Sequence, residues 1–288
     1  MYNVKHFFEP NSCSLSYLVY DEKSRDAVII DPFVAFDYPS GEVHLGPLQE
    51  VIQFIKDHKL NLHYVLETHV HADHISGANY LKQKFKSLKV AIHENITLVQ
   101  EKFKTLLNLE NFSCDASDFD VLFKGNQIIK AGSLNLKVVE TPGHTPACSS
   151  FIIGDMIFCG DTLFMPDFGT GRCDFPGGDA AKLYDSITGL YSKYPESKVY
   201  VGHDYMPGKR DLEFQTTISH SKTSNCHLSE KTSKEEFIKF RTDRDKGLSY
   251  PKNLYPSIQI NIRAGKLPGP QSNGRSYLKV PLKVNGSL

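Results

Sequence analysis

The chain has 288 residues, of which 40% are hydrophobic and 23% are charged, so it can bury a globular core without disulfides or structural metals. Lys and Arg number 33, as do Asp and Glu; the formal net charge of +0 at pH 7 gives no compositional support for a nucleic-acid or anionic-membrane partner. No run of about 18 apolar residues occurs, so we expect no membrane span and a neutral or small-molecule partner.

The first residues show neither a signal-peptide core nor an Arg-rich amphipathic pattern, so we expect a cytoplasmic location. Six scattered cysteines form no C-x-x-C pair: Cys13, Cys114, Cys148, Cys159, Cys173 and Cys226. This spacing favours reduced thiols over a disulfide framework or a cysteine-rich zinc site. Most of them are expected to be small buried hydrophobic residues.

The first elements in the chain are strands. Residues 4–31 read as three strands, which Pro32 ends because proline cannot donate to a strand ladder. Between Gly46 and Leu60, apolar residues recur every three or four positions, which predicts an amphipathic helix facing a sheet. A further strand is predicted over residues 62–67.

A histidine-rich loop follows that strand. Within six residues it carries His69, His71, Asp73 and His74. His69 and His71 are two apart, so in an extended segment both rings leave the same face and one ion can reach both. The pattern predicts a metal site at the carboxyl end of a strand. Residues 75–82 read as a helix, which Asp73 is placed to cap.

A second strand and helix follow, over residues 89–92 and from about Glu94 to Leu107, and this repetition favours α/β layering. From Asn126 the pattern changes. Short strands are predicted over residues 127–130, 134–140, 148–153 and 156–159. They form an antiparallel meander, so the sheet is expected to be mixed.

More candidate ligands follow strands. His144 lies in the turn Thr-Pro-Gly-His-Thr-Pro, and Asp161 follows a strand in Gly-Asp-Thr. A helix over 179–194 and a strand over 198–201 lead to His203. Each residue is a weak signal alone, because turn histidines are commonly structural or solvated. Beside the histidine-rich loop they become metal-ligand candidates.

The chain beyond residue 210 is more polar, with one further helix predicted near Ser233 to Arg244 and an edge-strand pattern over Leu278 to Val284. We expect residues 1–210 to form the domain with the metal site. Residues 211–288 are expected to be an extension packed on it, because a segment of this composition buries little surface by itself.

Together the candidate ligands resemble the metal-binding set of the metallo-β-lactamase superfamily, in residue type and in order along residues 1 to about 205. They are His69, His71, Asp73, His74, His144, Asp161 and His203. The resemblance implies an α/β fold, an αββα sandwich of two mixed β-sheets flanked by helices, with the active site along one edge of the sheets. This scaffold hosts hydrolases and oxygenases, so it does not by itself define the reaction.

Two further segments favour one subfamily. Residues 171–175, Gly-Arg-Cys-Asp-Phe, resemble the Gly-Arg-x-Asp-Phe element of the persulfide dioxygenases (sulfur dioxygenases), where glyoxalase II enzymes usually carry Gly-Lys-Phe-x-Glu-Gly. Residues 256–265 resemble the stretch near the end of these dioxygenases. The motif Gly-Thr-x-Arg-Cys-Asp-Phe-Pro-Gly-Gly is most similar to their bacterial β-lactamase-like hydrolase branch.

The resemblance implies one Fe(II) per chain, held by His69, His144 and Asp161, with two Zn ions as the alternative. The remaining ligand candidates, His71, Asp73, His74 and His203, would then orient the metal ligands and donate hydrogen bonds to bound oxygen. In a dinuclear hydrolase the same four residues would form a second metal position. Ligand identity leaves both arrangements open.

The implied reaction oxidises glutathione persulfide, or a related thiol persulfide, with O2 to sulfite and thiol in sulfide detoxification. The alternatives are a dinuclear zinc hydrolase of glutathione thioesters, as in glyoxalase II, and a non-enzymatic metal-binding or sensor protein. Arg172 is expected to bind a substrate carboxylate. The alternative is that it forms a structural salt bridge. Tyr205 either hydrogen-bonds the substrate or packs, and Cys173 is a persulfide contact or an oxidation-prone bystander. The thiol carrier and the oligomeric state stay open, with a homodimer as one candidate.

Overall fold

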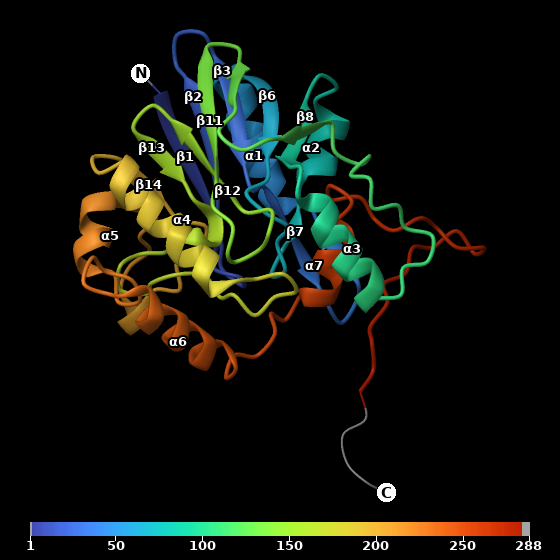
Figure 1. Ribbon diagram of the computed structural model, residues 1–288. Coiled ribbons are helices and arrows are strands. Elements are labelled where there is room, and N and C mark those ends of the chain that lie inside the picture. Colours follow the sequence, from blue (N-terminus) through green and yellow to red (C-terminus); the bar gives the residue numbers. More distant parts are fainter. Residues whose placement is uncertain (1, 284–288) are drawn as a thin grey trace, which may run out of the picture.

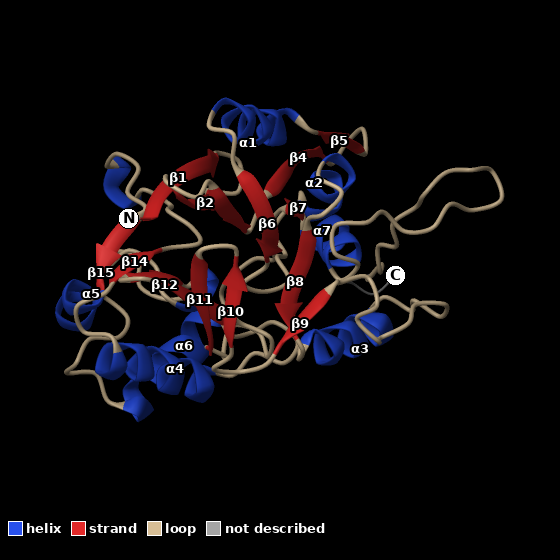
Figure 2. Cartoon of the chain, turned by 90° about the horizontal axis from the view of Figure 1, so that it is seen from above, coloured by secondary structure: helices blue, strands red, loops and turns tan. Residues whose placement is uncertain are grey.

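Two mixed β-sheets pack face to face in the computed structural model, which describes residues 2–283 (Figures 1 and 2). The first sheet consists, in order, of β1 (Tyr2–Glu9), β2 (Ser14–Asp21), β3 (Asp26–Ile30), β6 (Asn61–Leu66), β8 (Lys89–His93) and β9 (Val121–Phe123). The second consists of β10 (Ile128–Ala131), β11 (Leu134–Glu140), β12 (Ser149–Ile153), β13 (Met156–Phe158), β14 (Lys198–Tyr200) and β15 (Gln215–Thr217). A small sheet has the order β5 (Glu42–His44), β4 (Phe33–Asp37) and β7 (Ile75–Ser76).

Helices cover the outer face of each large sheet. The first sheet is covered by α1 (Gly46–Asp57), α2 (Ala78–Lys84), α3 (Ile96–Leu106) and α7 (Leu254–Asn261). The second is covered by α4 (Ala180–Lys193), α5 (Ile218–Ser224) and α6 (Lys234–Asp245). Two short 3-10 turns, η1 (Gly160–Thr162) and η2 (Pro207–Lys209), complete the assignment. The predicted αββα sandwich is therefore confirmed.

Strand direction changes once within the first sheet and twice within the second. Strands β1, β2 and β3 are antiparallel, whereas β3, β6, β8 and β9 are parallel. The second sheet is antiparallel from β10 to β13, parallel between β13 and β14, and antiparallel again at β15. The predicted meander is confirmed.

Alternation along β3 shows how one strand contributes to two cores. Val28 and Ile30 lie in the core between the two sheets, and Ala27 and Ile29 pack under the helices of the first sheet. Successive side chains of a strand point to opposite faces, so an apolar run of this kind is buried on both sides. The strand then ends at Asp31, which enters the candidate site.

Asp26, at the start of β3, joins the two sheets. Its Oδ2 accepts a hydrogen bond of 2.8 Å from the backbone N–H of Ser133, and its Oδ1 lies 2.6 Å from His63 Nε2. Burial by itself would raise the pKa of Asp26, but hydrogen bonds from His63 and Ser133 outweigh it and hold the pKa well below its usual range. The charged carboxylate thus stabilises the contact between the sheets.

Acid is therefore expected to weaken this contact. Because the folded pKa is depressed, the contribution of Asp26 is complete above the unfolded pKa of about 3.9 and is lost as the pH falls below it. Asp26→Asn should lower the free energy of unfolding by about 1 to 3 kcal/mol at pH 6. In urea unfolding of the metal-free chain, this difference should shrink towards pH 2. A difference that does not vary with pH would contradict the role of the charge.

Most predicted helices and strands are present. The helices expected in residues 46–60, 94–107, 179–194 and 233–244 are α1, α3, α4 and α6. Helix α6 begins with a capping box, in which Ser233 accepts from the backbone of Glu236 and Glu236 accepts from the backbone of Ser233. Strands β4, β5, β9 and β15 and helices α5 and α7 were not predicted.

The predicted helix over residues 75–82 is wrong in its first part. Ile75 and Ser76 form β7, which pairs with Phe33 and Val34 of β4, and α2 begins only at Ala78. Strand pairing satisfies buried backbone groups here, and this overrides the local helical pattern. The predicted cap is also wrong, because the N-cap of α2 is Gly77 and no side chain caps it.

Two other predictions need correction. Residues 278–283 contain no strand, and position 284 lies outside the described residues. All six cysteines are free, but only Cys148 and Cys159 are fully buried, so the expectation that most are buried is wrong. Cys173 is half-buried.

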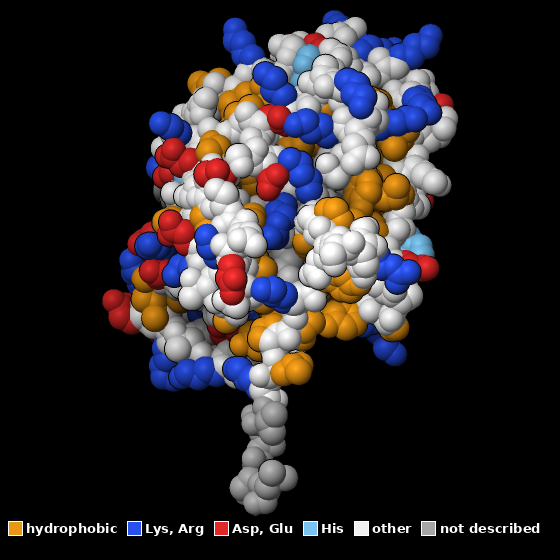
Figure 3. Space-filling model, turned by 90° about the vertical axis from the view of Figure 1, so that its right-hand side faces the viewer, with side chains coloured by type: hydrophobic (Ala, Val, Ile, Leu, Met, Phe, Trp, Pro, Cys, Tyr) orange, Lys and Arg blue, Asp and Glu red, His pale blue; other side chains and the backbone are white. Residues whose placement is uncertain are grey.

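Figure 3 shows charged side chains of both signs on one face of the molecule. There, Lys and Arg side chains are interspersed with Asp and Glu side chains, so this face has no patch of a single sign. Among residues 2–283, no helix combines the length and the apolar character needed to span a bilayer.

Candidate metal centre

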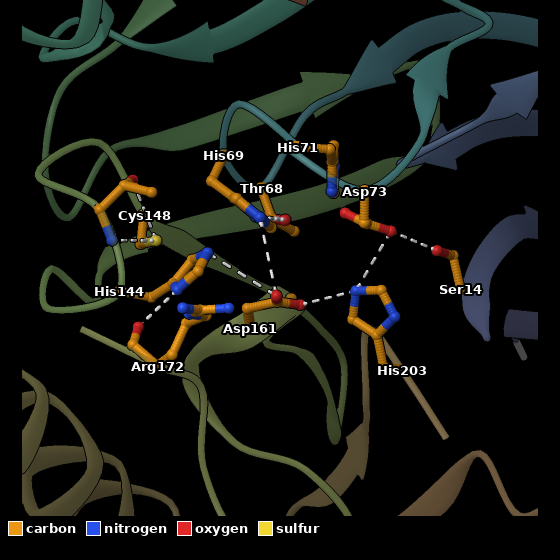
Figure 4. A network of polar contacts seen from close by, with 12 residues as sticks. Ser14, Thr68, His69, His71, Asp73, His144, Cys148, Asp161, Arg172 and His203 are labelled. Carbon is orange, nitrogen blue, oxygen red and sulfur yellow. Dashed lines mark hydrogen bonds and ion pairs between the residues drawn. The ribbon is translucent and has the colours of Figure 1, made fainter. Parts of the chain in front are cut away.

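The predicted ligands meet where several strands end (Figure 4). The loop after β6 brings His69, the turn after β11 brings His144, and η1 after β13 brings Asp161. Their donor atoms lie within 4.8 Å of one another. Asp161 Oδ2 is 3.9 Å from His69 Nε2 and 3.7 Å from His144 Nε2. These separations are close to the roughly 3 to 4 Å expected between ligands that are each about 2 Å from a metal.

Hydrogen bonds to the other ring nitrogen identify the tautomers of both histidines. Thr68 Oγ1 donates to Asp31 Oδ2 at 2.8 Å, so it accepts from Nδ1–H of His69 at 2.9 Å. Nδ1–H of His144 donates to the carbonyl oxygen of Arg172 at 2.6 Å. Each Nε2 therefore carries the lone pair. Burial, with the neighbouring histidines, holds the pKa of His69 well below its usual value, which keeps it neutral.

His203 and Asp73 lie on the opposite side of Asp161. His203 Nε2 is 3.3 Å from Asp161 Oδ1 and 3.7 Å from Asp73 Oδ2, while its Nδ1–H donates to the Ser12 carbonyl at 3.2 Å. Burial by itself would lower the pKa of His203, but Asp161 and Asp73 outweigh it and raise the pKa. A proton on Nε2 of His203 can therefore face Asp161.

Asp73 is engaged by its own neighbours. Ser14 Oγ donates to Asp73 Oδ2 at 2.7 Å, and Nδ1 of His74 lies 2.9 Å from the same oxygen. Burial would raise the pKa of Asp73, but His74 and His203 outweigh it and hold the pKa well below its usual value. Asp73 therefore remains a carboxylate that orients His74 and faces His203.

The His71 side chain contacts carboxylates outside this group of ligands. Its Nε2 lies 3.1 Å from Asp31 Oδ1 and 3.5 Å from Glu67 Oε2, and all three side chains are buried. Burial by itself would lower the pKa of His71, but Asp31 and Glu67 outweigh it and raise the pKa well above its usual value. The rings of His69 and His71 are neighbours, with centroids 4.1 Å apart. Even so, His71 is not in the donor group of His69, His144 and Asp161.

Unsatisfied polar atoms support a cation at this place. Asp161 Oδ1, His74 Nε2 and both ring nitrogens of His71 are buried and make no hydrogen bond among the described residues, although Asp161 Oδ1 lies 3.3 Å from His203 Nε2. Buried polar atoms without partners are rare, and a bound ion is one standard explanation for them. Two imidazoles whose Nε2 atoms face one carboxylate form a donor set that fits a divalent transition metal. A second set, from His71, Asp73 and His74, also lies within 4.8 Å.

Arg172 and Tyr205 both line cavities beside the metal ligands. Arg172 pairs with Asp174 through two contacts of 2.6 Å and donates to the Ser249 carbonyl at 2.8 Å. The salt bridge that sequence reasoning kept as an alternative is therefore present. A guanidinium has five N–H groups, so two remain without partners in the described chain. Tyr205 stacks on Phe168, with centroids 4.4 Å apart.

Cys173 does not show the character of a reactive thiol. Burial raises its pKa well above the usual value, and the opposing effect of Arg241 is smaller. Reactive cysteines have depressed pKa values, so this observation favours the bystander interpretation.

Sequence reasoning missed residues that orient the ligand loop. Asp31 accepts from the backbone N–H of Thr68 at 2.7 Å as well as from its hydroxyl. Asn261 donates to the carbonyl oxygens of His71 and His74, both at 2.8 Å. The position of Asp31 at a strand end was an available signal. No local signal links Asn261 to a loop nearly two hundred residues earlier.

Comparison with known proteins agrees with this geometry. The family model described as the metallo-beta-lactamase superfamily matches residues 14–203. The chain is 44% identical to Glyoxylase B2 of Dictyostelium discoideum over 281 residues, which are 97% of this chain and 96% of that protein. It is 29% identical to the mitochondrial persulfide dioxygenase ETHE1 of Homo sapiens over 265 residues, 91% of this chain and 88% of that protein.

A solved structure of ETHE1 from Myxococcus xanthus is also similar. The match has a TM-score of 0.73 and 30% sequence identity, and it covers 92% of this chain and 100% of that chain.

Proposed function

The chain belongs to the metallo-beta-lactamase superfamily, and from this premise we propose that it is a non-haem iron persulfide dioxygenase. The proposed reaction converts glutathione persulfide or a related thiol persulfide, O2 and water into the thiol, sulfite and two protons. Similarity to ETHE1 proteins supports this proposal. The proposed reaction would serve sulfide detoxification.

One observation carries the proposal. The donor atoms of His69, His144 and Asp161 converge, while His71 lies outside this group, with its Nε2 3.1 Å from Asp31 Oδ1 and 3.5 Å from Glu67 Oε2. Two histidines and one carboxylate are the ligand set of many Fe(II) oxygenases. These three residues would hold Fe(II), and the ion would supply the redox chemistry of the reaction with O2. One Fe(II) per chain is the proposed stoichiometry.

The protein's own residues would bind the substrate and manage protons. His203 can hold a proton on Nε2 that faces Asp161, and Asp73 fixes the charge on its other side. The free N–H groups of Arg172 would bind a substrate carboxylate. Phe164, Phe168 and Tyr205 line the adjoining cavity and would exclude water from the reacting sulfur.

A dinuclear zinc hydrolase of glutathione thioesters is the second candidate. The donor set of His71, Asp73 and His74 favours it, because these atoms could hold a second ion. The name of the Dictyostelium relative also points in this direction. In that case His71 would have to leave Asp31 and Glu67.

Arg172→Ala tests the substrate role. We expect KM for glutathione persulfide to rise by about 10- to 100-fold, as for a lost charged hydrogen bond of roughly 1.5 to 3 kcal/mol. Asp174→Ala is the matched control, because it breaks the same salt bridge but keeps the guanidinium. Equal, small effects of both variants on KM would make Arg172 structural.

The function itself is tested by two assays on the purified metal-loaded chain. O2 uptake and sulfite formation are measured with glutathione persulfide, and thioester cleavage is measured with S-lactoylglutathione. We expect one O2 consumed for each sulfite formed and little thioester cleavage. A zinc-containing protein that cleaves the thioester and takes up no O2 would refute the proposal.

We also propose a cytoplasmic location. The six free cysteines support it, since thiols persist in reducing compartments.

A further inference from the structure

Two cavities of unequal size adjoin the metal ligands. The smaller, about 230 Å³, reaches from Asp161 to helix α6. The larger, about 600 Å³, lies beside Asp73. Arg172 and Tyr205 line both cavities, so these two side chains stand where the cavities meet. A substrate with its sulfur at the metal ligands could therefore extend one arm into each.

The α6 wall of the smaller cavity is held in place by a buried ion pair. Arg241 pairs with Asp245, the shortest contact being 2.5 Å, and both side chains are at most 5% exposed. Arg241 also donates to the Thr170 carbonyl at 3.2 Å, and Asp245 accepts from the backbone N–H of Cys173 at 2.8 Å. These contacts attach α6 to the segment that carries Arg172.

Arg244 lies on the same face of α6 as Arg241. The two arginines are three residues apart on one face of the helix, and they line the cavity together with Leu248, which follows the end of α6. Arg241 and Arg172 are each neutralised by an aspartate. In the chain from residue 2 to residue 283, Arg244 has no carboxylate within 4.0 Å and no side-chain hydrogen bond. Arg244 is exposed and also lines a neighbouring open cavity with Glu236 and Asp243, but among the three arginines of the small cavity it is the one without an ion-pair partner.

His227 reports the same positive environment. Burial, followed by the charges of Arg241 and Arg244, lowers its pKa to about 3. The ring is therefore neutral at physiological pH, and its Nδ1 accepts from the backbone N–H of Thr170 at 3.0 Å. Asp161 is the one carboxylate among the residues that line the cavity, and it belongs to the metal ligands.

We propose that Arg244 binds the carboxylate on the shorter arm of a two-armed thiol substrate. The inference rests on the proposed function and deepens it by naming a specificity residue on α6. In glutathione the thiol is central, and the glycine arm is shorter than the γ-glutamyl arm. The glycine carboxylate suits the small cavity with its unpaired arginine. The γ-glutamyl end carries both charges and suits the larger cavity, which is lined by Asp37 and Lys252.

Binding of S-methylglutathione and of its glycine amide provides the test, because neither is oxidised or hydrolysed. Wild type, Arg244→Ala and Lys239→Ala are compared in metal-loaded form by calorimetry. Lys239 is the matched control: it is also a cation of α6, but its partner is the exposed Asp243. Arg244→Ala should weaken binding of S-methylglutathione by about 5- to 30-fold, with less effect at high salt. Lys239→Ala should change it less than about twofold.

The amide identifies which group Arg244 recognises. Wild type should bind the amide weakly, and Arg244→Ala should cause no further loss, as expected when both changes remove one interaction. Arg244→Lys should restore part of the binding of the acid. Equal losses for acid and amide would overturn the proposal, as would no loss for either. The proposal would also be overturned if Arg244→Ala changed only the inhibition of O2 uptake by sulfite. The cavity would then hold the reaction product instead of the glycine arm.

These outcomes are separate from failure of the proposed function. If the chain takes up no O2 but the acid and amide differ as described, the subsite stands and the dioxygenase proposal fails. If O2 uptake is present but Arg244→Ala binds both ligands like wild type, the subsite fails alone. Circular dichroism and thermal unfolding exclude misfolding of the variants.

Discussion

Replacing His144 with Ala is expected to abolish stable iron binding and O2 uptake. His144 Nε2 is one of only two imidazole donors in its group, and its Nδ1–H is fixed by the Arg172 carbonyl. Removal of outer hydrogen-bond partners commonly costs 10- to 100-fold in metal affinity, so loss of a ligand should exceed about 100-fold. Iron content after dialysis, measured by mass spectrometry, gives the result independently of activity.

His220→Ala is the matched control, because His220 is exposed and far from the ligand loop in the sequence. It should bind as much iron as wild type. Full iron content in His144→Ala would refute the proposed ligand set. Normal iron in His71→Ala, by contrast, is the expected outcome.

Asp31→Ala is expected to give a large loss of stability. Asp31 is 3% exposed, pairs with His71 and accepts from both the backbone and the hydroxyl of Thr68. Removing one partner of a buried ion pair leaves an uncompensated charge and costs about 3 to 5 kcal/mol. The free energy of unfolding of the metal-free chain should fall by that amount in urea denaturation.

The same variant should also weaken metal binding. Without Asp31, Thr68 no longer has a fixed acceptor, so it no longer determines the tautomer of His69. We expect a loss of about 10- to 100-fold in iron affinity. Asp155→Ala is the control, because its side chain is 63% exposed and its pairing with Lys198 should contribute less than about 1 kcal/mol. Equal losses of the free energy of unfolding in Asp31→Ala and Asp155→Ala would show that the buried pair of Asp31 and His71 does not stabilise the fold.

The fold was largely predictable because its strands carry strong patterns. Runs such as Ala27–Ile30 are apolar at every position, and several of the turns between strands contain Gly, Pro or Asn. Several short elements were missed, among them the three-residue strands β5, β9 and β15, because such strands depend on pairing rather than on composition. Strand β7 exists because Phe33 and Val34 pair with it, which no local signal reveals.

The candidate site shows the same division. His69, His144 and Asp161 each follow a predicted strand, so their convergence at one edge could be anticipated. The contacts of His71 with Asp31 and Glu67 could not be anticipated from the sequence. Asp31 reaches the loop only because β3 pairs with β6, and its backbone lies in the left-handed region at φ 49°. Arg244 depends on the docking of α6, which the sequence pattern left unplaced.

The most direct test of the account is an anaerobic titration of the metal-free chain with Fe(II), followed by calorimetry and metal analysis, in wild type and His71→Ala. We predict saturation at one iron per chain in both proteins, because His71 is paired with Asp31 and Glu67 rather than with the metal. Saturation at two ions per wild-type chain, with one of them lost in His71→Ala, would contradict the account.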